Sequence, residues 1–160
     1  NAIYGWQAAF SAAALSNASV FGSQAGYSLT TGANDAYGNR ALFSCATGSG
    51  SVAVGTSSLL SFTGSGATAV GSDAGYNATT ATNLTVIGRR TAYTKQTGAD
   101  DTYVGFSAGF ANAAKNNNSQ GSTGVGAYAL GHATGGGFNA ACGRAAGWYG
   151  DDAFQNAWLG

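Results

Sequence analysis

A glycine recurs at nearly constant intervals along the whole chain of 160 residues. The successive intervals are 17, 16, 17, 16, 17, 17, 21, 17 and 17 residues. The repeat glycines are Gly5, Gly22, Gly38, Gly55, Gly71, Gly88, Gly105, Gly126, Gly143 and Gly160. Such a period is typical of repeat proteins, in which one coil of chain stacks on the next. We therefore expect a rod with columns of like residues along it. Its function would lie on its surface, at its tip or in its oligomeric packing.

Alignment on the glycine shows three further columns. The residue before it is apolar and forms the apolar column: Tyr4, Phe21, Tyr37, Val54, Val70, Ile87, Val104, Val125, Cys142 and Leu159. The residue three before it is mostly small or hydroxylic and forms the threonine column: Ala2, Ser19, Asp35, Val52, Thr68, Thr85, Thr102, Thr123, Ala140 and Ala157. The residue five after it is usually aromatic and forms the aromatic column: Phe10, Tyr27, Phe43, Leu60, Tyr76, Tyr93, Phe110, Gly131 and Trp148.

These columns predict an all-β fold, a parallel β-solenoid of about nine coils of 16–17 residues in a single domain over residues 1–160. Segments such as Thr68-Ala69-Val70 alternate as a short strand does, and we expect strands of about five residues. The glycine would allow a bend or a close backbone contact. A second extended piece would carry the aromatic column as stacked rings, and the polar Ser/Thr/Gly stretch would turn into the next coil.

The composition limits what such a chain can do alone. It has 27 glycines, no proline and no methionine. Coils with such small side chains bury little apolar surface when alone. We therefore expect an elongated homotrimer with one apolar column toward its axis. Six basic and six acidic residues balance, which argues against nucleic acid as a partner. No apolar run reaches the roughly 20 residues that span a bilayer, so we expect no membrane insertion.

The residues with catalytic or metal-binding potential are few. His132 is the only histidine and there is no Glu, so we expect no metal site, no cofactor and no enzyme. Asp100-Asp101 and Asp151-Asp152 are interpreted as turn residues, since neighbours along a strand point to opposite faces. Cys45 and Cys142 would lie about 28 Å apart, too far for a disulfide, and Cys142 is expected to be buried.

The repeat units resemble those of bacteriophage tail fibres, in which Asn-Thr-Ala-Val-Gly-x-x-Ala-Leu segments recur between Thr-Thr-Gly turns. The matching segments are Gly22-Ser23-Gln24-Ala25-Gly26-Tyr27, Gly38-Asn39-Arg40-Ala41-Leu42-Phe43 and Gly71-Ser72-Asp73-Ala74-Gly75-Tyr76. The units are also similar to the head repeats of trimeric autotransporter adhesins, which have a shorter period. The resemblance implies a fibrous trimeric β-solenoid in a virion or on a bacterial surface, with other fibre or tail proteins as partners, within a longer chain.

Two places break the period, and they are the candidate regions for receptor binding. The alternatives are a solvated turn at the first place and a hydrophobic cap or a junction to another domain at the second. The 21-residue interval contains an insertion around residues 115–120, and loops inserted into repeats often bind. Near the C-terminal end, aromatic residues gather beside acidic ones, as in many sugar-binding sites. The candidate receptor residues are Lys115, Asn116, Asn117, Asn118, Ser119, Gln120, Trp148, Tyr149 and Trp158.

The sequence thus predicts a structural and adhesive segment of a phage tail fibre that contacts a host-surface polysaccharide. Three alternatives stay open: a trimeric bacterial adhesin, a glycan-depolymerising tailspike, and an ice-binding solenoid that uses the threonine column.

Overall fold

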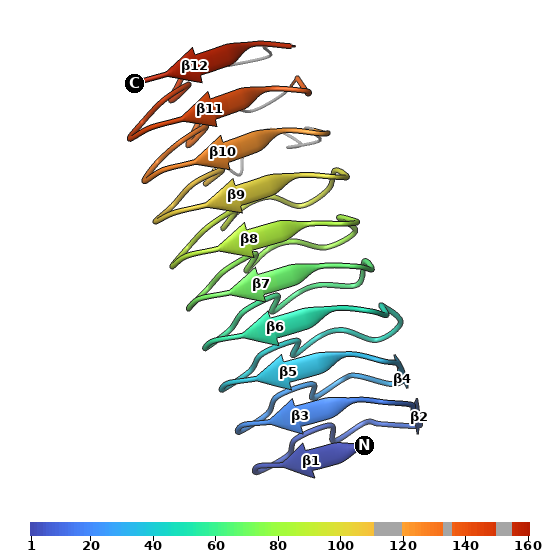
Figure 1. Cartoon of the computed structure of the whole chain (residues 1–160). Coiled ribbons are helices and arrows are strands. Elements are labelled where there is room, and N and C mark those ends of the chain that lie inside the picture. The colour runs from blue at the N-terminus through green and yellow to red at the C-terminus, as the bar shows by residue number, and fades with distance from the viewer. Residues whose placement is uncertain (111–119, 133–135, 150–154) are drawn as a thin grey trace.

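The computed structural model describes residues 1–110, 120–132, 136–149 and 155–160. These residues form the expected all-β parallel β-solenoid and contain no helix, hence no helical span of a membrane. The coils follow one another from the N-terminal to the C-terminal end of the stack (Figure 1). One strand from each coil adds to a ten-stranded parallel sheet with the order β1-β3-β5-β6-β7-β8-β9-β10-β11-β12.

The sheet strands are β1 (Ala2–Tyr4), β3 (Ser19–Phe21), β5 (Asp35–Tyr37), β6 (Val52–Val54), β7 (Thr68–Val70), β8 (Thr85–Ile87), β9 (Thr102–Val104), β10 (Thr123–Val125), β11 (Ala140–Cys142) and β12 (Ala157–Leu159). Their register follows the glycine alignment, so that Thr68 pairs with Thr85 and Val70 with Ile87. Each strand has three residues rather than the expected five. It is short because the glycine after it leaves the extended conformation, with φ of +134° at Gly71.

The repeat glycine also allows close backbone contact between coils, as the sequence predicted. A Cβ placed on Gly71 would lie 2.6 Å from the carbonyl oxygen of Gly88 in the next coil. The same clash recurs at the other repeat glycines from Gly5 to Gly143. The period therefore marks the corner where successive coils are too close for a side chain.

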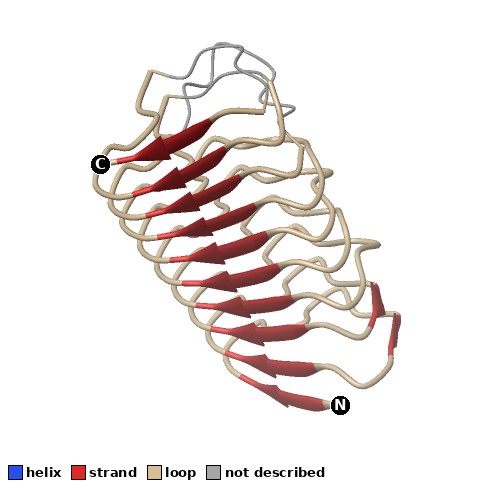
Figure 2. Ribbon diagram, turned by 45° about the horizontal axis from the view of Figure 1, so that its top comes forward, coloured by secondary structure: helices blue, strands red, loops and turns tan. Residues whose placement is uncertain are grey.

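The prediction of a second extended segment after the glycine is wrong. That segment is a run of tight turns in which the second residue after the glycine has positive φ, 57° at Asp73 and 58° at Arg90. The Ala74 N–H donates to the Gly71 carbonyl within the turn, and the Gly75 N–H donates to Thr91 of the next coil. Turns thus replace strand pairing here while still joining the coils by backbone hydrogen bonds. Figure 2 shows the strands of the large sheet along one side of the solenoid, and loops with a second, short sheet elsewhere.

A short second parallel sheet lies where the polar stretch turns into the next coil. It pairs β2 (Ala14–Leu15) with β4 (Thr31–Gly32). Further along, isolated bridges join Ser65 to Thr82, Thr82 to Ala99, and Ala99 to Gln120. Gln120 therefore belongs to a regular rung of the solenoid.

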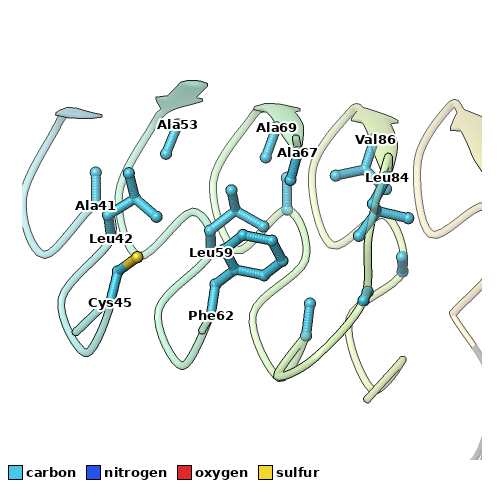
Figure 3. Close-up of a cluster of buried hydrophobic side chains, with 14 of the residues drawn as sticks. Ala41, Leu42, Cys45, Ala53, Leu59, Phe62, Ala67, Ala69, Leu84 and Val86 are labelled. Carbon is cyan, nitrogen blue, oxygen red and sulfur yellow. The ribbon is translucent and has the colours of Figure 1, made fainter. Parts of the chain in front are cut away.

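The core is a narrow column of small and branched apolar side chains. In the ten-stranded sheet, the middle residue of each strand from β3 to β11 lies toward the inside and is buried. The residue three after the glycine is also buried, as at Ala41 and Ala74. Leu42, Leu59 and Phe62 fill the remaining space (Figure 3). The small core residues allow the two sides of each coil to approach closely.

A column of buried polar side chains connects the coils inside this core. It lies four residues before the glycine, where Asn34, Ser51, Asp101, Ser122 and Asn139 are buried. The backbone N–H of Ser51 donates to Asn34 Oδ1 at 3.0 Å, and Asn34 Nδ2 donates to the Gly48 carbonyl at 2.7 Å. Each such side chain satisfies backbone groups of the next coil that would otherwise be buried without partners.

Candidate functional site

The outer face of the ten-stranded sheet, which we call the sheet face, displays the apolar and threonine columns together. Both columns point outward because they lie two residues apart on a strand. Val70 is 38% exposed and Ile87 is 41% exposed. Near the N-terminal end, Phe21 stacks on Tyr4 and Tyr37 at centroid distances of 5.3 and 5.4 Å. The expectation that Cys142 is buried is wrong, because its column faces outward and the thiol is exposed.

The sheet face is nearly free of charge. Asp35 is the one Asp, Glu, Lys or Arg residue in the two columns, and its Oδ1 accepts a hydrogen bond from the Ser19 N–H at 3.0 Å. Thr68, Thr85, Thr102 and Thr123 stand in register on adjacent strands. The sheet face is therefore a neutral, periodic surface that suits packing against another regular surface.

The aromatic column forms stacked rings, as expected. Tyr27 stacks between Phe10 and Phe43 at centroid distances of 5.2 and 5.0 Å. Tyr93 stacks between Tyr76 and Phe110 at 5.0 and 5.6 Å. The Arg40 guanidinium lies over Phe43, 4.8 Å from its centroid. Leu60 interrupts the stack, and its side chain is buried.

The stack also ends where Gly131 replaces the aromatic residue, and this substitution shapes the C-terminal end of the described solenoid. A Cβ on Gly131 would lie 2.2 Å from Cζ3 of Trp148. The indole thus occupies the space that a side chain at residue 131 would need. Tyr128 meets the same indole edge to face, with centroids 5.2 Å apart and planes at 80°.

The rings of Tyr128 and Trp148 line a surface pocket that we call the aromatic pocket. It has a volume of about 450 Å³ and is lined by Tyr128, Arg144, Ala145 and Trp148. A second hollow of about 420 Å³ also lies against Trp148 and is lined further by Tyr149 and Trp158. Trp148 is common to both hollows.

His132 extends the ring cluster around Trp148. Its centroid lies 4.5 Å from that of the indole and 6.0 Å from that of Tyr149. His132 therefore packs against the rings of Trp148 and Tyr149. Across the described residues, no group of three His, Cys or Asp side chains is placed to hold a metal ion.

The structure brings together Trp148, Tyr149 and Trp158, the three aromatic residues that the sequence singled out as receptor contacts. Trp158 is the middle residue of β12 and packs partly against the core. Of the other candidate group, Gln120 forms a regular bridge with Ala99 of the preceding coil. Its remaining members, Lys115, Asn116, Asn117, Asn118 and Ser119, fall outside the described residues.

Sequence reasoning missed Tyr128 and Arg144. Tyr128 lies two residues after a repeat glycine, where the other coils carry polar or small residues, so no aromatic column marks it. Arg144 directly follows a repeat glycine, at a position where the residue type varies from Trp6 to Ala127, so it does not stand out along the chain. The available signal was the loss of the aromatic side chain at Gly131, which opens room for rings from the neighbouring coil.

The interpretation of Asp101 as a turn residue is wrong. Its Oδ2 lies 2.8 Å from Lys95 Nζ, and both side chains are fully buried. Burial raises the pKa of the Asp101 carboxyl and lowers the pKa of the Lys95 ammonium, while the attraction between the two groups opposes both shifts. Asp101 Oδ1 also accepts a hydrogen bond from the Ser122 N–H at 2.8 Å. Asp101 therefore belongs to the buried polar column and cannot reach an external substrate.

Its neighbour Asp100 is exposed and has the positive φ of a turn, 60°. Its carboxylate accepts a hydrogen bond from Asn83 Nδ2 at 2.9 Å. Asp151 and Asp152 lie outside the described residues. Both cysteines are free thiols, and burial raises the pKa of the Cys45 thiol.

Comparison with protein-family models, curated proteins and solved structures gave no match.

Proposed function

We propose that this chain is a structural and adhesive segment of a fibre, of the kind found in phage tails. Several copies would pack through the sheet face into a stiff homotrimeric shaft. The shaft would present its aromatic pockets to a polysaccharide on the host surface. The fold and the repeat resemblance support the shaft, and the location would be the virion.

The observation that carries the adhesive role is the aromatic pocket. Most of the described surface consists of columns that repeat from coil to coil and offer little selectivity. The pocket instead combines two mutually perpendicular rings, Tyr128 and Trp148, with the donor groups of Arg144. Aromatic faces stack on the apolar faces of sugar rings, and guanidinium N–H groups donate to sugar oxygens.

A shallow pocket of this kind binds one sugar unit weakly. Three copies on one shaft would bind a repetitive polysaccharide much more tightly, because each further contact is intramolecular. This arrangement suits a fibre that must first find a cell surface reversibly and then hold it.

The test is the binding of the purified protein to immobilised bacterial polysaccharides and to cells. Trp148→Ala should weaken binding by about tenfold or more per site, since removing a stacked ring costs about 1–3 kcal/mol. Phe10→Ala is the matched control, because the Phe10 side chain is also aromatic, is 63% exposed and lies at the opposite end of the solenoid. Equal binding by wild type and Trp148→Ala would refute the adhesive role of the pocket.

A further inference from the structure

The rings of the aromatic pocket continue along the surface into the preceding coils. Phe106 meets Tyr128 edge to face at a centroid distance of 5.2 Å, and Tyr128 meets Trp148 at the same distance. Phe106 in turn lies under the Arg89 guanidinium, which is 5.0 Å from its ring centroid. We call this continuous surface, formed by Arg89, Phe106, Tyr128, Arg144 and Trp148, the aromatic strip.

The aromatic strip has a cation at each end. Arg89 and Arg144 both follow a repeat glycine directly, and they lie three coils apart. At about 4.8 Å per coil, their backbones are about 14 Å apart. Both residues are exposed, and neither makes an ion pair with a carboxylate of the described residues.

The positive charge of the strip is local, since the chain as a whole has no net charge. The two residues after each repeat glycine in these four coils are Arg89 and Arg90, Phe106 and Ser107, Ala127 and Tyr128, and Arg144 and Ala145. They include three arginines and no carboxylate. Aromatic residues therefore separate two cationic ends on a rod that has no net charge.

We propose that the aromatic strip binds an acidic oligosaccharide, with Arg89 and Arg144 each holding an anionic group of the chain and Phe106, Tyr128 and Trp148 contacting the sugar rings between them. The inference rests on the proposed function and names the class of glycan. A guanidinium presents paired N–H donors that match the two oxygens of a carboxylate. A short run of sugars with carboxylates at intervals spans the distance between the two arginines.

The test compares acidic oligosaccharides with their own neutral forms by calorimetry. The probes are oligogalacturonate, oligomers of hyaluronate and oligosialate, each paired with its carboxyl-reduced form. At least one acidic probe should bind tenfold or more tightly than its reduced partner, and its affinity should fall as salt rises. Dextran sulfate against dextran shows whether any anionic sugar suffices or a carboxylate is needed.

Variants of the two arginines locate the binding. Arg89→Gln should reduce the affinity for the acidic probe about tenfold and leave the affinity for the neutral form unchanged, because Arg89 lies outside the aromatic pocket. Arg144→Gln should also reduce the affinity for the acidic probe about tenfold, and it should reduce the affinity for the neutral form less, because Arg144 lines the pocket. The matched control is Arg40→Gln, because Arg40 also lies over an aromatic ring but outside the strip. Circular dichroism of each variant checks that the solenoid is intact.

The outcomes separate this inference from the proposed function. The acidic-glycan inference would be overturned if no acidic probe bound more tightly than its neutral form. It would also be overturned if both arginine variants bound the acidic probe as tightly as the wild type does. If Trp148→Ala still weakened the binding of neutral glycans, the adhesive role would stand without it. If Trp148→Ala had no effect on any glycan, the proposed function would fail as well.

Discussion

At the scale of single residues, the repeat glycines limit the sequence most strictly. Gly71→Ala places a Cβ 2.6 Å from the Gly88 carbonyl oxygen and at a φ of +134°. The backbones of two coils must move apart, so we expect a loss of about 2–4 kcal/mol in the free energy of unfolding. Ser72→Ala, one residue further, should cost less than about 1 kcal/mol. Urea unfolding followed by circular dichroism measures both, and equal losses would contradict the role of the glycine.

The buried pair of Lys95 and Asp101 is the second residue-scale feature. Lys95→Met leaves the Asp101 carboxyl buried without its partner, which should cost about 3–5 kcal/mol. Lys95→Met with Asp101→Asn removes both charges and keeps an acceptor for the Ser122 N–H. The double variant should therefore recover most of the stability in thermal unfolding. If it is no more stable than Lys95→Met alone, the loss comes from packing and not from the unpaired carboxyl.

At the scale of the element, the buried polar column joins many of the coils to the next, while Ala18, Ala67 and Leu84 hold its position in three others. Asn34→Ala removes an acceptor for the Ser51 N–H and a donor to the Gly48 carbonyl, both buried. We expect a loss of about 2–4 kcal/mol, because two backbone groups remain without partners. Asn39→Ala is the control, since exposed Asn39 also donates to a carbonyl of a neighbouring coil, that of Ser23. Its loss should be within about 1 kcal/mol, because water replaces the lost partner.

The same columns explain how much of the fold the sequence predicts. The alignment on the glycine gives the strand register directly, because the period fixes which residue stacks on which. It also predicts the stacked rings of Tyr27 and Tyr93. These features depend on one position repeated in every coil, so a single sequence displays them many times.

Features that depend on two different columns could not be predicted. The turn run after the glycine reads as a strand in a one-dimensional pattern, although alternate residues such as Asp73 have positive φ. Lys95 and Asp101 lie six residues apart, and their contact requires the path of the coil between them. The aromatic pocket likewise joins Tyr128, Arg144 and Trp148 from neighbouring coils.

At the scale of the whole molecule, the sheet face is the surface on which a shaft would assemble. Its apolar column is about two-fifths exposed at Val70 and Ile87, and its neutral side chains repeat at the spacing of the strands. A second copy presents the same spacing, so the two surfaces can pack in step along their length. Burying such a face adds the apolar contact that these small-residue coils lack alone.

Charged residues on the sheet face should therefore block assembly. Val70→Lys with Ile87→Lys places two ammonium groups in the centre of the packed face, where their desolvation opposes association. In sedimentation, the wild type should have three times the chain mass of 15.7 kDa, and the double variant should dissociate toward single chains. Asn39→Lys with Thr56→Lys adds the same charge at exposed positions outside the sheet face and should leave the trimer intact. A wild type of single-chain mass, or a charged sheet face that still assembles, would show that the shaft does not form through this surface.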